Sequence, residues 1–200
     1  MHPLGFFPGA WHTRQSTVKT EAARSLASPA YCSQRCLRPT ALCGGMAATA
    51  LVLDTAEGVI TLQLRPDAAP ETVKYILKCV ASKLYDGKEF YRSDFVIQFG
   101  LHGSGVECPH GNLHVNETAV GPRLSNTRGT CSIAHWDVPD CGNTEAFINL
   151  KENAHLDSAY GGYCVFAEVK DEASFAVVDK IAAAVAAGRN TRIHSVTASA

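Results

Sequence analysis

The stretch "EFYRSDFVIQFG", residues 89–100, places one arginine, Arg92, inside a run of aromatic and aliphatic residues. Such a run is typical of a buried strand, and Gln98 follows Val96 at the two-residue spacing of one strand face. A guanidinium keeps its charge at any physiological pH and offers five N–H donors. Ordinary core packing therefore does not fully explain this stretch. Arg92 is a candidate functional residue, or else a partly buried arginine paired with a Glu or Asp.

Length and composition bound the class of protein. The chain has 200 residues, 46% hydrophobic and 18% charged, which is enough for one full-sized core. The formal net charge of −1 argues against a nucleic-acid partner or a polybasic membrane surface. The longest apolar candidate, "FAVVDKIAAAVAAG", is interrupted by Asp179 and Lys180, so no stretch reaches the roughly 18 apolar residues of a membrane span. We therefore expect neither nucleic acid nor membrane as a partner.

The N-terminal segment differs from the rest of the chain. Residues 1–45 hold five basic residues against one acidic residue, Glu21, and show no persistent strand or helix pattern. We expect a disordered or targeting extension at 1–45 and one folded domain at 46–200. A transit peptide, a plain disordered extension, and translation from Met46 all stay open. We expect a cytoplasmic protein, with mitochondrion or plastid as the alternative.

Cysteine and histidine are numerous but show no metal-ligand pattern. The eight cysteines have no repeated spacing, so we interpret them as mostly reduced thiols. Zinc ligands of the right type fall in 102–114 and 131–141, but neither segment has paired C-x2-C or H-E-x-x-H spacing. Nothing marks one thiol as an activated nucleophile, and "GLHGSG" at 100–105 lacks the Lys-Ser/Thr of a phosphate loop. We expect no metal and no cofactor.

Regular patterns begin near residue 49. Residues 48–64 predict two strands around a tight turn at 56–58. Residues 69–84 predict a helix of about fourteen residues with Pro70 in its first turn. A second helix is predicted at about 173–187, ending at Gly188. Short strand-like runs lie between the helices, and a last one follows at 194–199. Many short strands without edges favour a closed antiparallel barrel.

Several motifs together resemble the cyclophilin-type peptidyl-prolyl isomerases. That family carries a Phe-His-Arg element followed by Phe-Met-x-Gln-Gly-Gly, and this chain has "FYR" at 90–92 and "FVIQFG" at 95–100. Further similar motifs follow in the family's order: "APETVKYIL", "NTRGT", "AFINL", "HLD", "GGYCVFAEV" and "VVDKI". The sequences of these motifs are more similar to the bacterial-type branch of the family than to the familiar animal cytosolic one.

The resemblance implies a mostly β fold: a closed eight-stranded antiparallel β-barrel capped by two α-helices, with a substrate groove on its outer face. It implies an enzyme that accelerates X-Pro bond rotation in peptides and folding proteins, and it assigns Arg92 the catalytic role. It also implies a monomer that binds proline-containing peptides. The substrate-binding residues it implies are Phe95, Val96, Phe147 and Leu156 in the proline pocket, Gln98 and the main chain of His135 beside Ala134 for the peptide backbone, and Tyr163 and His155 at the rim.

Departures from the family pattern leave a second hypothesis open. Tyr91, Val96 and Phe99 replace the usual His, Met and Gly, and Glu145 puts a carboxylate where a neutral amide is expected. That carboxylate could pair with the guanidinium and compete with substrate. The alternative function is therefore a weakly active proline-peptide binding module within a larger assembly. His155 stands where the animal proteins carry the Trp that helps bind cyclosporin, so we expect weak cyclosporin binding.

Overall fold

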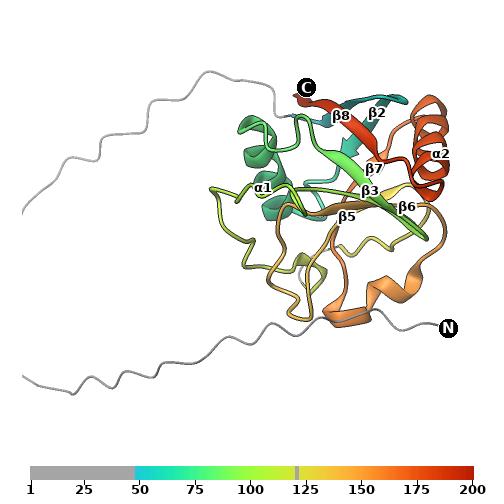
Figure 1. Ribbon diagram of the computed structural model, residues 1–200. Coiled ribbons are helices and arrows are strands. Elements are labelled where there is room, and N and C mark those ends of the chain that lie inside the picture. Colours follow the sequence, from blue (N-terminus) through green and yellow to red (C-terminus); the bar gives the residue numbers. More distant parts are fainter. Residues whose placement is uncertain (1–47, 120–121) are drawn as a thin grey trace, which may run out of the picture. The chain divides into compact units, whose positions relative to one another are not determined.

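The computed structural model describes residues 48–119 and 122–200 as a closed barrel with two helices beside it (Figure 1). All strand pairs are antiparallel, in the order β1–β2–β7–β5–β6–β4–β3–β8. The predicted fold class is confirmed, whereas the predicted extension at 1–45 lies outside the described residues. The strands are β1 Ala50–Thr55, β2 Gly58–Leu64, β3 Glu89–Ser93, β4 Val96–Phe99, β5 Thr130–Ile133, β6 Ala146–Asn149, β7 Val165–Val169 and β8 Thr191–Ser199.

The first two strands form the predicted hairpin. Thr55 pairs with Gly58 across the turn, and the Thr55 hydroxyl donates to the Gly58 carbonyl at 2.6 Å. Gly58 has a φ of +130°, a conformation that side-chain-bearing residues rarely adopt. Along β2, alternate residues Ile60 and Leu62 point inward and are fully buried, as expected for a strand with one face on the core.

The two predicted helices are present on opposite sides of the strands (Figure 1). Helix α1, Pro70–Ala81, is shorter than predicted, because the chain leaves helical geometry at Ser82 and Lys83 takes a positive φ of 55°. Helix α2, Glu172–Ala186, begins at an Asp171 cap that accepts from the Ser174 amide at 2.8 Å. No helix in the described part of the chain is long and apolar enough to cross a membrane.

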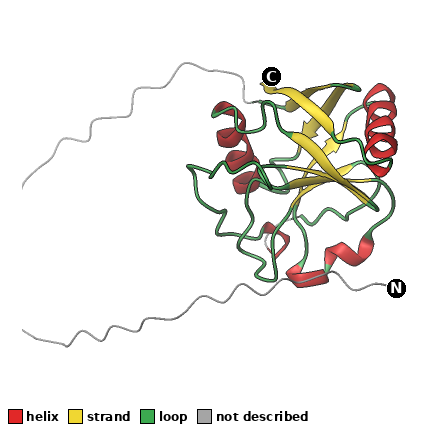
Figure 2. Cartoon of the chain, viewed as in Figure 1, coloured by secondary structure: helices red, strands yellow, loops and turns green. Residues whose placement is uncertain are grey.

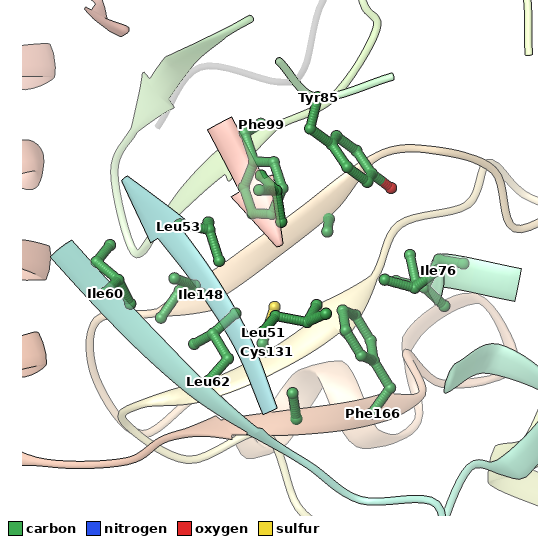
Figure 3. Packing of buried hydrophobic residues seen from close by; sticks show 14 of the residues in the cluster. Leu51, Leu53, Ile60, Leu62, Ile76, Tyr85, Phe99, Cys131, Ile148 and Phe166 are labelled. Atoms are coloured by element: carbon green, nitrogen blue, oxygen red, sulfur yellow. The ribbon is translucent and has the colours of Figure 1, made fainter. Parts of the chain in front are cut away.

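The inside of the barrel is filled with side chains (Figure 3). Six apolar side chains there each keep at most 3% of their surface exposed: Leu51, Leu53, Ile60, Leu62, Ile148 and Phe166. Side chains fill this eight-stranded barrel and leave no room for a ligand inside it. Any binding site must therefore lie on the outer face of the barrel.

Long loops and short 3-10 turns make up much of the chain between β4 and β7 (Figure 2). Three completely buried asparagines hold these segments in place. The Asn149 amide donates to the side-chain oxygen of Asn126 at 3.1 Å, and the Asn153 amide donates to the side-chain oxygen of Asn149 at 2.8 Å. Asn153 also donates to the Phe95 carbonyl at 3.0 Å. We call Asn126, Asn149 and Asn153 the asparagine network.

The same network reaches the turn Ala154–Asp157. The Asn126 amide nitrogen donates to the Asp157 carboxylate at 2.9 Å and to the Tyr163 carbonyl at 3.1 Å. Burial by itself raises the pKa of Asp157, but hydrogen bonds from Ser125 and Asn126 outweigh it and hold the pKa below its usual value. Asp157 is therefore ionised at neutral pH and fixes the turn through charged hydrogen bonds.

Asn126→Ala should lower the free energy of unfolding by about 2–4 kcal/mol, because it leaves buried partners without hydrogen bonds. Asn112→Ala, at an exposed loop position, should change it by less than about 0.5 kcal/mol. Urea unfolding of both variants measures the difference. Equal stability of the two variants would contradict the role given to the network.

Candidate active site

A second apolar cluster lies apart from the barrel core. Its buried members are Val96 of β4, Phe147 of β6 and Leu156 of the turn Ala154–Asp157. Half-buried side chains pack against them: Phe95, Ala134 and Tyr163. All six residues were predicted to contact substrate, and the structure brings them together. Because three of the six remain partly exposed, the cluster offers an apolar surface that a prolyl ring can contact.

Arg92 stands at the edge of this cluster. Its guanidinium carbon lies 5.3 Å from the centre of the Phe95 ring. Its Nη1 donates to Oε1 of Gln98 at 3.0 Å, the residue opposite it across β3 and β4. Its side chain keeps 36% of its surface exposed. The Arg92 guanidinium, which core packing does not fully explain, therefore faces solvent beside the predicted pocket.

The carboxylate that holds Arg92 is Asp94. Its Oδ2 accepts from Nε of Arg92 at 3.0 Å and from Nη2 at 2.8 Å. Its Oδ1 accepts from the backbone amides of Phe95 at 2.6 Å and Val96 at 3.2 Å. One oxygen of Asp94 is thus held by backbone amides while the other contacts the guanidinium. The three contacts to Asp94 and Gln98 leave two of the five N–H groups of Arg92 for a ligand.

The expectation that Glu145 could pair with Arg92 is wrong. The Glu145 carboxylate accepts from the Tyr91 hydroxyl at 2.5 Å and from the His102 amide at 2.9 Å. Burial raises the pKa of Tyr91, and the hydrogen bond to Glu145 raises it further, so the hydroxyl stays protonated and donates. The carboxylate sits against Gly100, where an added Cβ would come within 2.3 Å of it. Tyr91 and Glu145 both depart from the family pattern, and each is the hydrogen-bond partner of the other.

Three ring contacts form the rim of the site. His155 is exposed and lies edge-on to Phe95, with ring centres 5.5 Å apart. His135 stacks on Tyr163 at 4.4 Å, and Tyr163 meets Phe147 at 5.6 Å. The predicted positions of His135, His155 and Tyr163 thus surround the cluster.

The cysteines and histidines of the loops do not converge. His110 contacts the Ser82 hydroxyl at 2.9 Å, and Cys108 lies 3.5 Å from the Tyr75 hydroxyl. Within residues 48–119 and 122–200, no group of three or more His, Cys, Asp or Glu residues could hold a metal ion. The cysteines in this part are free thiols, Cys79, Cys108, Cys131, Cys141 and Cys164.

Sequence reasoning missed the polar residues that hold the site. Asp94 lies only two residues after Arg92, which was a usable signal, since alternate residues of a strand share a face. The asparagine network had no such signal, because asparagines beside strand ends usually indicate exposed turns.

Comparison with known proteins places the chain in a family. Residues 50–198 match the family model of the cyclophilin type peptidyl-prolyl cis-trans isomerases. The chain is 38% identical over 144 residues to peptidyl-prolyl cis-trans isomerase B of Escherichia coli, covering 68% of this chain and 85% of the relative. It is 36% identical over 138 residues to isomerase A of Dickeya dadantii, covering 66% and 70%.

Solved structures show the same fold. A Cryptosporidium parvum cyclophilin type isomerase, crystallised in the presence of the dipeptide Ala-Pro, matches with a TM-score of 0.64 at 21% sequence identity. The match covers 76% of this chain and 99% of that one. At this identity the likeness shows a common fold, the closed barrel described above.

The chain belongs to the cyclophilin-type peptidyl-prolyl cis-trans isomerases, and the two bacterial proteins above are among its relatives. It is an enzyme of that class. The relatives are named as isomerases, and nothing in these comparisons favours the alternative of a binding module with little turnover.

Asp94→Ala should lower kcat/KM on a short X-Pro peptide about threefold to tenfold, because a partly exposed ion pair is worth about 1 kcal/mol and orients Arg92. Asp54→Ala, at an exposed position on β1, is the matched control and should keep full activity. In an Arg92→Ala background, Asp94→Ala should cause no further loss. An equal loss in both backgrounds would show that Asp94 acts independently of the guanidinium.

Proposed function

We propose that Arg92 is the catalytic group and that its two remaining N–H groups contact the X-Pro amide. Resonance of the nitrogen lone pair imposes a rotation barrier of roughly 18–20 kcal/mol on that bond. An N–H aimed at the prolyl nitrogen stabilises the twisted amide, in which the lone pair is localised. The clamp formed by Asp94 and Gln98 supports this role, since it holds the guanidinium before substrate arrives.

The apolar cluster provides the other half of the proposed mechanism. The prolyl ring would pack on Phe95, Phe147 and Leu156. These apolar contacts would hold the substrate and make no hydrogen bond to the carbonyl of the rotating X-Pro bond. Gln98 accepts from Arg92 with its oxygen, so its amide nitrogen is left to donate to a substrate carbonyl. The backbone beside Ala134 and His135 would bind the peptide chain. Selective binding of the twisted state then lowers the barrier.

One observation carries this proposal: a guanidinium that is fixed on two sides stands 5.3 Å from an aromatic ring of the exposed apolar cluster. The two remaining donors of Arg92 lie beside an apolar surface that suits a prolyl ring.

Arg92→Ala should reduce kcat/KM about tenfold to a hundredfold, since a hydrogen bond from a charged donor is worth about 1.5–3 kcal/mol. A protease-coupled assay on a short X-Pro peptide measures this loss. Arg189→Ala removes an exposed arginine that follows α2 and should retain activity. Wild-type activity in Arg92→Ala would refute the role assigned to Arg92.

We also propose that His155 limits cyclosporin affinity. Its ring already faces Phe95 from the rim, and an indole there would add contact area and a well-placed donor. His155→Trp should therefore tighten cyclosporin binding about thirtyfold to two-hundredfold. His114→Trp, on an exposed loop, is the control. Titration calorimetry with no gain in His155→Trp would show that position 155 does not contact the drug.

A further inference from the structure

Exposed apolar side chains occur on two loops that also carry residues of the proposed site. Five large hydrophobic residues of the described chain are strongly exposed, and three of them lie on the two loops that carry His135 and Tyr163. Trp136 is 68% exposed and Val138 is 55% exposed on the loop between β5 and β6, while Tyr160 is 52% exposed in the 3-10 turn Ala159–Gly161. We call Trp136, Val138 and Tyr160 the apolar ridge.

The two loops of the ridge are joined to each other and to the pocket. Nε2 of His135 lies 3.0 Å from the Gly162 carbonyl. An added Cβ at Gly161 would come 2.7 Å from Cβ of Pro139, so the loops are in direct contact. The stacked His135 and Tyr163 rings continue this contact into the cluster that holds Phe147. The two loops that carry the apolar ridge are therefore in contact with each other and with the apolar cluster.

Internal packing does not account for the ridge. Tyr160 has φ 52° and ψ 31°, a left-handed conformation that destabilises a bulky residue. A buried aromatic side chain would offset that strain through packing, but Tyr160 is half exposed. Tryptophan is also highly buried on average in folded proteins. A strained tyrosine and an exposed tryptophan side by side with a binding surface are explained by a contact made outside the chain.

We propose that the apolar ridge binds a bulky apolar side chain of the same polypeptide whose proline occupies the pocket. This inference rests on the proposed function, since it takes the cluster of Phe95, Phe147 and Leu156 as the proline site. The preferred substrates are then extended, unfolded segments with an aromatic or leucine residue near the proline. Asp137 and Asp140, exposed on the same loop, disfavour acidic segments.

Three peptides test the proposal with the full chain. One is a short Ala-Pro peptide that cannot reach the ridge, and the others are longer and carry either Phe or Ser at matched positions on both sides of the proline. Wild type should prefer the Phe peptide about fivefold to tenfold in kcat/KM, mainly through KM. Trp136→Ala should remove most of that preference, and Val59→Ala, at a distant exposed position on β2, should keep it.

Tyr160→Gly is a second variant that cannot fail through strain, because glycine adopts the left-handed conformation freely. It should weaken the preference without lowering the melting temperature. An unchanged preference in both Trp136→Ala and Tyr160→Gly would overturn the proposal. Absence of wild-type activity on the short peptide would instead refute the proposed function.

Fluorescence provides an independent readout. The chain has two tryptophans, Trp11 and Trp136, so Trp136 is the sole reporter in Trp11→Phe. The Phe peptide should shift its emission to shorter wavelength, and the Ser peptide should not. A shift that appears with rising protein concentration and no peptide would identify a second copy as the occupant and overturn the assignment.

Discussion

The buried asparagine network is the constraint on which the site depends. Asn126, Asn149 and Asn153 are completely buried and bonded to one another. The network also ties the turn that carries Leu156 and the carbonyls of Phe95 and Tyr163. Their amide groups donate to one another and to buried backbone carbonyls, which restricts how these loops can be arranged. The network thus positions the turn of Leu156 and the segment of Tyr163, which complete the apolar cluster begun by the strand residues Val96 and Phe147.

The site separates two carboxylates that a single arginine could attract. Asp94 is anchored by backbone amides and orients the guanidinium, while Glu145 is occupied by Tyr91 and by the His102 amide. This arrangement leaves Arg92 positioned but not saturated. The proposed role of Arg92 needs both properties, since a saturated guanidinium has nothing to donate and a mobile one is poorly aimed.

The sequence predicted the fold and the pocket better than it predicted the polar residues that hold the pocket in place. Periodicity placed both helices and the first hairpin, and the family resemblance named the six residues that the structure gathers into one cluster. Sequence pattern alone did not decide which carboxylate pairs with Arg92: the structure pairs it with Asp94, and Glu145 is held by Tyr91 instead. Buried asparagines and the apolar ridge depend on how distant loops meet, which local patterns do not encode.

The most direct test of this account is a crystal structure of the protein with a bound Ala-Pro dipeptide. The account predicts the prolyl ring on Phe95, Phe147 and Leu156, with an N–H of Arg92 directed at the prolyl amide and Asp94 still holding Nε. A dipeptide bound elsewhere, or an Arg92 side chain turned away from the amide in the occupied site, would contradict it.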